Sequence, residues 1–200
     1  MRIFLVGMAI CLGLAQPAAA DLVLFDVRGT NGDFDFNTQT GTFTDSGTGL
    51  MITFSAQVDG IDAGVVNATG DSLGINAPGT DDTDQIDGDA GVEELIISFS
   101  GPSTITNVLL TELDIIGHGP TESATLTIGG SSAPISNGTG TAIPGHTNLL
   151  GSSFSLAFVS GNGFGLETFS LHITAVPEPS SLMFAGLFSI LGCGCRRRRA

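Results

Sequence analysis

The chain is poor in basic residues and contains no lysine. Its 200 residues include 6 Lys+Arg and 20 Asp+Glu, which gives a formal net charge of −14. The segment from Asp21 to Val176 has 19 acidic residues and a single basic one, Arg28. Nucleic-acid binding depends on neutralising phosphates with Lys and Arg, so this composition excludes a nucleic-acid partner. An anionic lipid surface would repel the same segment.

Tryptophan and tyrosine are absent, and the three cysteines (Cys11, Cys193 and Cys195) lie near the two ends. Without Trp and Tyr, the chain lacks the flat amphipathic rings on which carbohydrate platforms usually depend. Without cysteine, the middle of the chain must fold by packing alone, with no disulfides. Its 42% hydrophobic content is sufficient for a core, which excludes a disordered acidic chain. The length is that of one domain.

The first 20 residues have the pattern of a secretory signal peptide. Arg2 gives a positive start, and an apolar run follows from Ile3 to Leu14. The small residues Ala18 and Ala20 then precede Asp21, as in a signal peptidase cleavage site. The sequence therefore predicts export, with signal peptidase as an early partner and a mature chain that begins near Asp21.

The last 25 residues combine three features in a fixed order. A short motif is followed by an apolar run over 181–195 and then by an arginine cluster. The motif is Val176, Pro177, Glu178 and Pro179, and the cluster is Arg196, Arg197, Arg198 and Arg199. As a helix the apolar run is about 22 Å long, short of a hydrocarbon core of about 30 Å, which predicts a marginal transmembrane helix. The positive-inside rule places the arginines in the cytoplasm and the body of the protein outside.

This order resembles the PEP-CTERM sorting signal of exported bacterial proteins, over residues 176–200 only. The resemblance implies recognition by an exosortase, a membrane protease or transpeptidase that would remove the helix near the motif. It also implies a Gram-negative-type envelope, a transient stay in the inner membrane, and a destination at the cell surface or in an extracellular matrix or biofilm. It implies no activity for the domain that is sorted. The alternative is a simple tail anchor on the outer face of the inner membrane.

Residues 21–175 show the period-two alternation of β-strands, most clearly over 169–174. Further strands are predicted over 22–27, 40–44, 50–58, 65–69, 95–100, 105–115, 123–128 and 154–158. About nine strands with Gly-rich turns predict an all-β fold, an antiparallel two-sheet β-sandwich or jelly-roll-like domain. Consecutive apolar residues at 108–110 predict a bulge, or a strand buried on both faces. Two long connections are expected, over 70–92 and 129–152.

Residues 70–74, of sequence GDSLG, match both the block that names the GDSL hydrolases and the G-x-S-x-G nucleophile elbow. Both patterns need a helix after the serine, here Ser72, and residues 75–79 cannot start one. The chain also lacks the later Asp-x-x-His with which these hydrolases pair their serine. The three histidines (His118, His146 and His172) have no metal-ligand spacing. The sequence therefore predicts a turn at Ser72, surface histidines and no enzymatic activity.

An acidic segment over residues 81–94 is the strongest local candidate for a binding site. Calcium takes six to eight oxygen ligands, and the candidates here are Asp82, Asp84, Asp87, Asp89 and Glu94. An EF-hand is excluded, because aligning the segment on Gly88 puts Thr83 and Gln85 at ligand positions. Calcium is the one cofactor that the sequence suggests. The alternative interpretation is a solvated acidic loop.

Three functions remain open from the sequence. The first is an exported, exosortase-processed protein of the cell surface or matrix with a structural or adhesive role. The second is a calcium-assisted module that binds extracellular polysaccharide through the 81–94 segment. The third, which the pattern around Ser72 disfavours, is a hydrolase.

Overall fold

The computed structural model describes residues 19–29, 37–77, 85–117, 121–135, 141–142 and 148–176. Residues 20–175 form one compact unit, and a second unit, residues 1–19 with 176–200, falls almost entirely outside the described residues. The helices predicted for the signal peptide and for 181–195 therefore lie outside the described residues. Within those ranges no helix is long and apolar enough to cross a membrane.

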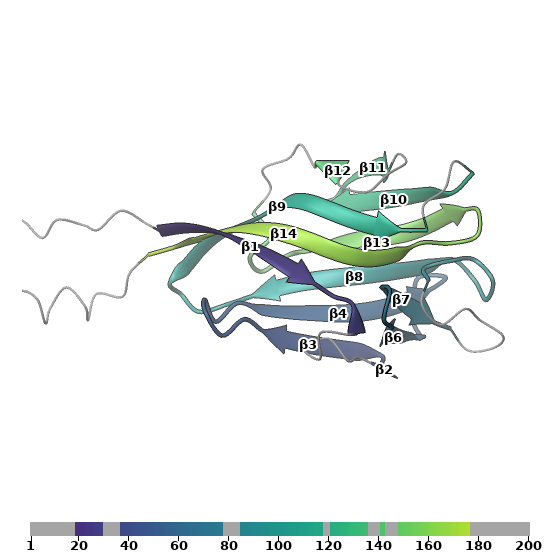
Figure 1. Ribbon diagram of the computed structural model, residues 1–200, viewed down its shortest axis with the longest axis horizontal. Coiled ribbons are helices and arrows are strands. Elements are labelled where there is room, and N and C mark those ends of the chain that lie inside the picture. The colour runs from purple at the N-terminus through teal and green to yellow at the C-terminus, as the bar shows by residue number, and fades with distance from the viewer. Residues whose placement is uncertain are drawn as a thin grey trace, which may run out of the picture. The chain divides into compact units, whose positions relative to one another are not determined.

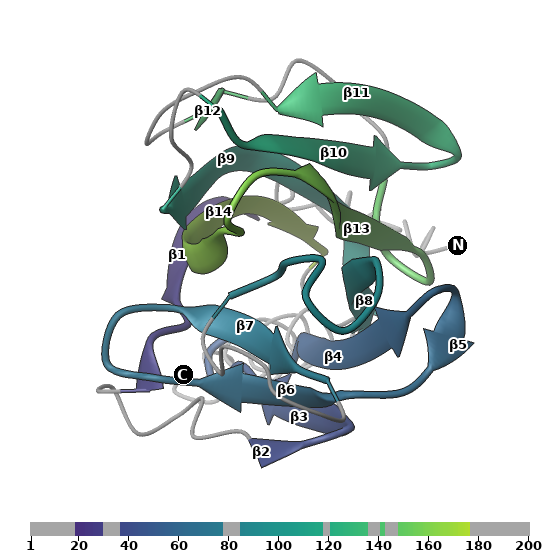
Figure 2. The ribbon, with the colours of Figure 1, turned by 90° about the vertical axis from the view of Figure 1, so that its right-hand side faces the viewer.

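Two seven-stranded antiparallel sheets account for the described residues (Figures 1 and 2). The first sheet has the order β12 (Thr141–Ala142), β9 (Ile105–Ile116), β14 (Gly165–Ala175), β7 (Leu73–Asn76), β6 (Val65–Ala68) and β2 (Asn37–Thr38), with β1 (Ala19–Asp26) also beside β14. The second has the order β11 (Ser131–Ile135), β10 (Ser123–Ile128), β13 (Ser153–Ser160), β8 (Glu93–Ser100), β4 (Met51–Val58) and β3 (Thr40–Thr44), with β5 (Ile61–Asp62) also beside β4. The predicted two-sheet all-β fold is confirmed.

Alternation of apolar and polar residues decides which side chains enter the space between the sheets. In β8 every second residue from Glu93 to Phe99 is buried, and the residues between them are half-buried. In β4 the buried positions are Ile52, Phe54, Ala56 and Val58. One face of each strand is thus removed from water, which provides the main favourable free energy of folding.

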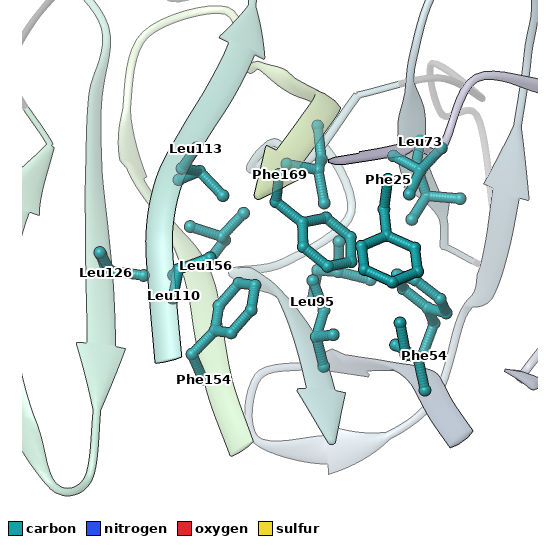
Figure 3. Packing of buried hydrophobic residues seen from close by; sticks show 14 of the residues in the cluster. Phe25, Phe54, Leu73, Leu95, Leu110, Leu113, Leu126, Phe154, Leu156 and Phe169 are labelled. Carbon is teal, nitrogen blue, oxygen red and sulfur yellow. The ribbon is translucent and has the colours of Figure 1, made fainter. Parts of the chain in front are cut away.

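Phe169 of β14 lies at the centre of the core (Figure 3). Its ring stacks on Phe25 of β1 with 5.1 Å between centroids, and it meets Phe154 of β13 edge-on at 6.1 Å. Phe99 of β8 and Phe54 of β4 complete the group at 6.5 and 6.4 Å. Because these rings come from both sheets, the phenylalanines join the layers directly.

The two long connections that the sequence predicts contain further strands. β7 lies within 70–92, and β11 and β12 lie within 129–152. In β7 the residues from Leu73 to Ile75 are all buried, so no polar alternation marks the strand. β11 is a mostly exposed edge strand that contains Pro134, and it forms by pairing with β10. The expectation of about nine strands was therefore too low.

The bulge predicted in the strand over 105–115 is present. Leu110 of β9 pairs with Leu171 of β14, and Glu112 pairs with Ser170, which leaves Thr111 as the extra residue. The Thr111 hydroxyl donates to the Ser170 carbonyl oxygen at 3.1 Å. The bulge thus follows the apolar run by one residue and keeps Leu110 and Leu113 both directed into the core.

The first and last strands place both chain exits at the same end of the sheets. β1 pairs with β14, and the Val27 N–H at the end of β1 donates to the Glu167 carbonyl near the start of β14. The start of β1 therefore lies beside the end of β14, as Figure 1 shows on the left. We call this the exit end. It also contains the turns at residues 45–50, 101–104 and 129–130.

Candidate functional site

The described part of the 81–94 segment is built around two buried carboxylates. Asp87 is 2% exposed and Glu93 is 0% exposed. The Asp87 N–H donates to Glu93 Oε2 at 2.9 Å, and Asp87 Oδ1 accepts from the Asp89 N–H at 2.8 Å. These bonds fasten the connection onto the first residue of β8. Carboxylates that accept main-chain N–H groups in this way fix a turn as well as supplying oxygen atoms.

Strand alternation separates Glu93 from the predicted ligand Glu94. Glu93 shares the inward parity of Leu95, whereas Glu94 lies on the outer face of β8, opposite Gln57 of β4 and Ala157 of β13. The sequence interpretation overlooked Glu93. The alternation of buried residues in β8 would have identified it, because Glu93 is two residues before Leu95 and therefore faces the same side of the strand.

The predicted calcium ligands are only partly within the described residues. Asp87, Asp89 and Glu94 are described, whereas Asp82 and Asp84 lie outside the described residues. In the described ranges no three His, Cys, Asp or Glu side chains are grouped so that they could hold a metal ion. Tight packing surrounds Asp87, because a Cβ at Gly163 would lie 2.7 Å from the Asp87 Cβ.

Arg28 forms a second cluster of charge at the junction of β1 and β14. Its Nε donates to Asp26 Oδ1 at 2.8 Å, and its Nη1 donates to Glu167 Oε1 at 2.8 Å. The hydrogen bond to Asp26 raises the pKa of Arg28 further above its ordinary value, and the negative charges of Glu167 and Asp114 act in the same direction. The cluster joins the N-terminal strand to the C-terminal strand, which is a structural task.

Ser72 lies in the turn between β6 and β7 and is 3% exposed. The Thr69 N–H donates to the Ser72 carbonyl at 2.8 Å, which closes the turn. A strand, β7, follows directly, where a hydrolase elbow needs a helix. Of the three histidines, His172 is half-buried on β14, and His118 and His146 lie outside the described residues.

The outer face of the second sheet presents rows of small hydroxyl side chains. In one row Thr42 of β3 opposes Thr53 of β4, Thr53 opposes Ser98 of β8, and Ser98 opposes Ser153 of β13. A neighbouring row runs through Thr40, Ser55, Ser155, Thr127 and Ser132. Ile96 interrupts this row, and Ser155 is buried. Adjacent strands repeat these groups about every 4.8 Å. On an acidic domain, this part of the surface is uncharged.

The two predicted processing sites lie at the borders of the folded unit. Ala18 lies outside the described residues, and Ala20 and Asp21 belong to β1. The last strand ends at Ala175. Val176 is exposed, and the rest of the predicted sorting motif, with the arginine cluster, lies outside the described residues.

Residues 175–199 match the family model of the PEP-CTERM protein-sorting motif. The chain carries a PEP-CTERM sorting signal. This confirms the resemblance found in the sequence and identifies an exported protein that is directed to an exosortase through a membrane-anchored C-terminal signal. No curated protein and no solved structure matches the chain. The PEP-CTERM signal therefore accounts for the delivery of the domain.

Proposed function

We propose that the protein is an exosortase-processed component of the cell surface or extracellular matrix, with a structural or adhesive role and no enzymatic activity. The observation that carries this proposal is that the folded domain ends where the sorting signal begins. β14 ends at Ala175, and the PEP-CTERM match begins at residue 175. Removal of the signal would leave both sheets with all their strands, so the cargo is a self-contained sandwich.

The chemistry of the sandwich supports a structural role. The phenylalanine core around Phe169 joins both sheets without any cysteine, so its stability does not depend on the redox state of the surroundings. The hydroxyl rows through Thr53 and Ser98 offer many equivalent hydrogen-bonding groups to a polyhydroxylated polymer. An adhesive protein that works through many weak contacts needs no deep binding pocket.

Processing is tested by the intact mass of the protein recovered from cells with and without the exosortase. With the enzyme, we expect a chain that starts at Asp21 and has lost residues after the motif. Replacing Pro177, Glu178 and Pro179 together with alanine should leave the C-terminal segment in place. The fold should be unaffected, because β14 ends before the motif. An unprocessed mass in exosortase-positive cells carrying the wild-type chain would contradict the proposal.

Adhesion through the hydroxyl rows is tested by co-sedimentation with exopolysaccharide. The double substitution Thr53→Glu and Ser98→Glu places two charges in the centre of one row, and we expect retention by the polymer to fall. The matched control, Thr106→Glu and Thr174→Glu, changes two threonines of the first sheet, which pair β9 with β14 through a hydrogen bond of 3.2 Å. Equal retention of both variants would exclude the hydroxyl rows as the adhesive surface.

A calcium-assisted glycan-binding module is the second candidate. The burial of Asp87 and Glu93 within the 81–94 segment favours it, because their oxygens are held in place by main-chain hydrogen bonds. Such a module would bind polysaccharide only with calcium present. Polysaccharide retention that is unchanged by a chelator would leave the first proposal in place and exclude this one.

A further inference from the structure

The carboxylates of the domain are distributed unequally between its two ends. At the exit end, Asp21 and Asp45 are the only acidic residues among those the structure describes. Its turns otherwise carry small neutral residues, such as Ser46 and Ser103, both exposed. The predominantly acidic character of the chain therefore does not extend to the end from which both termini leave.

The opposite end, which we call the acidic end, carries seven of the 14 acidic residues that the structure describes. Asp59 and Glu93 both lie there, since Asp59 Oδ1 accepts from the Val92 N–H at 2.9 Å and Glu93 begins β8. Further acidic residues of this end are Asp62, Asp87, Asp89, Glu94 and Glu122. The Arg28 cluster, with Asp26, Asp114 and Glu167, lies in the half of the first sheet nearer to this end.

The length of the strands sets how far these charges lie from the exits. β14 has 11 residues between Gly165 and Ala175, so it spans about 33 Å at 3.3 Å per residue. The Debye length at physiological ionic strength is about 8 Å. A charge at the acidic end is therefore about four Debye lengths from the exit end. The electrostatic repulsion between an anionic surface at the exit end and the carboxylates of the acidic end would therefore be almost completely screened.

Exposed apolar side chains lie at both ends of the domain. Leu22 on β1 is 66% exposed, and Met51 at the start of β4 is 40% exposed. Met51 pairs with Ser100, beside the turn over 101–104, so it belongs to the exit end. Leu22 lies close to the Ala20 exit. At the acidic end Ile61 is 67% exposed, Val92 50% and Val159 55%. Apolar exposure is therefore similar at the two ends, which differ in charge.

We propose that the domain stands upright on its exit end against the lipid surface while the PEP-CTERM segment is anchored, with the acidic end directed away. The occupant of this surface is the bilayer that holds the C-terminal segment. Two observations carry the proposal: the adjacent exits of β1 and β14, and the scarcity of described charge between them. A domain lying flat would bring its carboxylates within a Debye length of anionic lipid. The inference rests on the anchored, exported protein described above.

The test uses the full chain in vesicles that contain anionic lipid and lipid with a nitroxide on its headgroup. Cys11, Cys193 and Cys195 are replaced by serine, after which a single fluorescent label is attached at Ser46→Cys or at Asn162→Cys. Asn162 is exposed in the turn that connects β13 and β14, at the acidic end. We expect strong quenching of the label at position 46 and little or none at position 162. Equal quenching at both positions, or stronger quenching at 162, would overturn the proposal.

Vesicle flotation distinguishes this failure from failure of the anchoring itself. A chain that does not float with the vesicles contradicts the membrane anchor, and the upright orientation falls with it. A chain that floats with equal quenching at both positions contradicts the orientation alone.

A charge series adds a second readout, with the fluorescent label attached at the exposed Gly130→Cys site of the exit end. The double substitution Ser46→Asp with Ser103→Asp should reduce the quenching of this label, and the reduction should be larger at low salt than at high salt. The matched Asn162→Asp variant should leave that quenching unchanged, and an equal effect of both would count against the proposal.

Discussion

Arg28 and Glu167 connect the first strand of the domain to the last. The Arg28 Nη1 donates to Glu167 Oε1 at 2.8 Å across a sequence separation of 139 residues. Asp26 holds the other side of the guanidinium, so one base bridges carboxylates from β1 and β14. Because β1 can pair with β14 only after the last strand has been made, this contact closes the fold and links the two processing sites structurally.

Replacing the single base should weaken this closure in a salt-dependent way. In Arg28→Gln the carboxylates of Asp26, Glu167 and Asp114 would repel one another without compensation. We expect a lower melting temperature than in the wild type, with the difference shrinking as salt is added. Thermal unfolding at low and high ionic strength measures it. Glu167→Gln should have a smaller effect, because the bonds between Arg28 and Asp26 remain. A wild-type midpoint for Arg28→Gln at low salt would contradict this account.

The central phenylalanine should be the most sensitive position of the core. Phe169 contacts rings from both sheets and is fully buried, so Phe169→Ala should lower the free energy of unfolding by about 3–5 kcal/mol. Phe158 of β13 is only partly buried at the rim of the core. Phe158→Ala therefore serves as the matched control, and we expect a clearly smaller loss. Urea unfolding of both variants measures the difference, and equal losses would argue against Phe169 as the centre.

The fold was predictable where alternation is strong. Residues 40–44 were predicted as a strand and form β3 with the same bounds, and the inward positions of Phe54, Phe99 and Phe169 follow from period-two spacing. β7 escaped prediction because Leu73 and Ile75 flank a glycine that is itself buried, which hides the polar half of the pattern. β11 escaped because its residues SSAPI carry no strand signal and depend on pairing with β10.

The sites were predictable where the signal is local in sequence. The PEP-CTERM motif is a contiguous run of residues and needs no tertiary contact to be recognised. The Arg28 cluster depends on a contact between residues distant in sequence, Arg28 and Glu167, which composition does not reveal. In the acidic segment, charge spacing suggested Glu94, whereas strand parity brings Glu93 next to Asp87. Which of the two glutamates lies next to Asp87 depends on the alternation of β8, so the strand has to be placed before the two can be told apart.

Two glycines with positive φ should respond differently to a methyl group. Gly163 has φ +103°, and a Cβ there would lie 2.7 Å from the Asp87 Cβ. Gly130 has φ +80° with nothing within 4 Å of such a Cβ. Gly130→Ala should cost only the backbone strain of about 1–2 kcal/mol. Gly163→Ala should cost at least about 1 kcal/mol more, because Asp87 has to move as well. Denaturant unfolding of both variants measures the two losses of stability. Equal losses would show that Asp87 can move aside without a cost in free energy.

Calcium should stabilise the protein if the 81–94 segment binds it. A ligand that binds only the folded state adds about 2.7 kcal/mol of stability at 100 times its dissociation constant, so excess Ca²⁺ should raise the thermal midpoint above that in chelator. We expect Asp82→Asn with Asp84→Asn to abolish the shift. Glu94→Gln should retain it, because Glu94 lies on the outer face of β8, whereas Glu93 is hydrogen-bonded to Asp87.

The outcomes of that experiment separate the site from its ligand assignment. Identical midpoints of the wild type in Ca²⁺ and in chelator would exclude a calcium site in this segment. A shift that disappears in Glu94→Gln would instead restore Glu94 as a ligand and contradict the role assigned to strand parity. A shift that survives in Glu94→Gln but disappears in Asp82→Asn with Asp84→Asn would locate the ion between the loop and the buried carboxylates at the start of β8. Calcium would then neutralise charge at the end of the domain where the described acidic residues are concentrated.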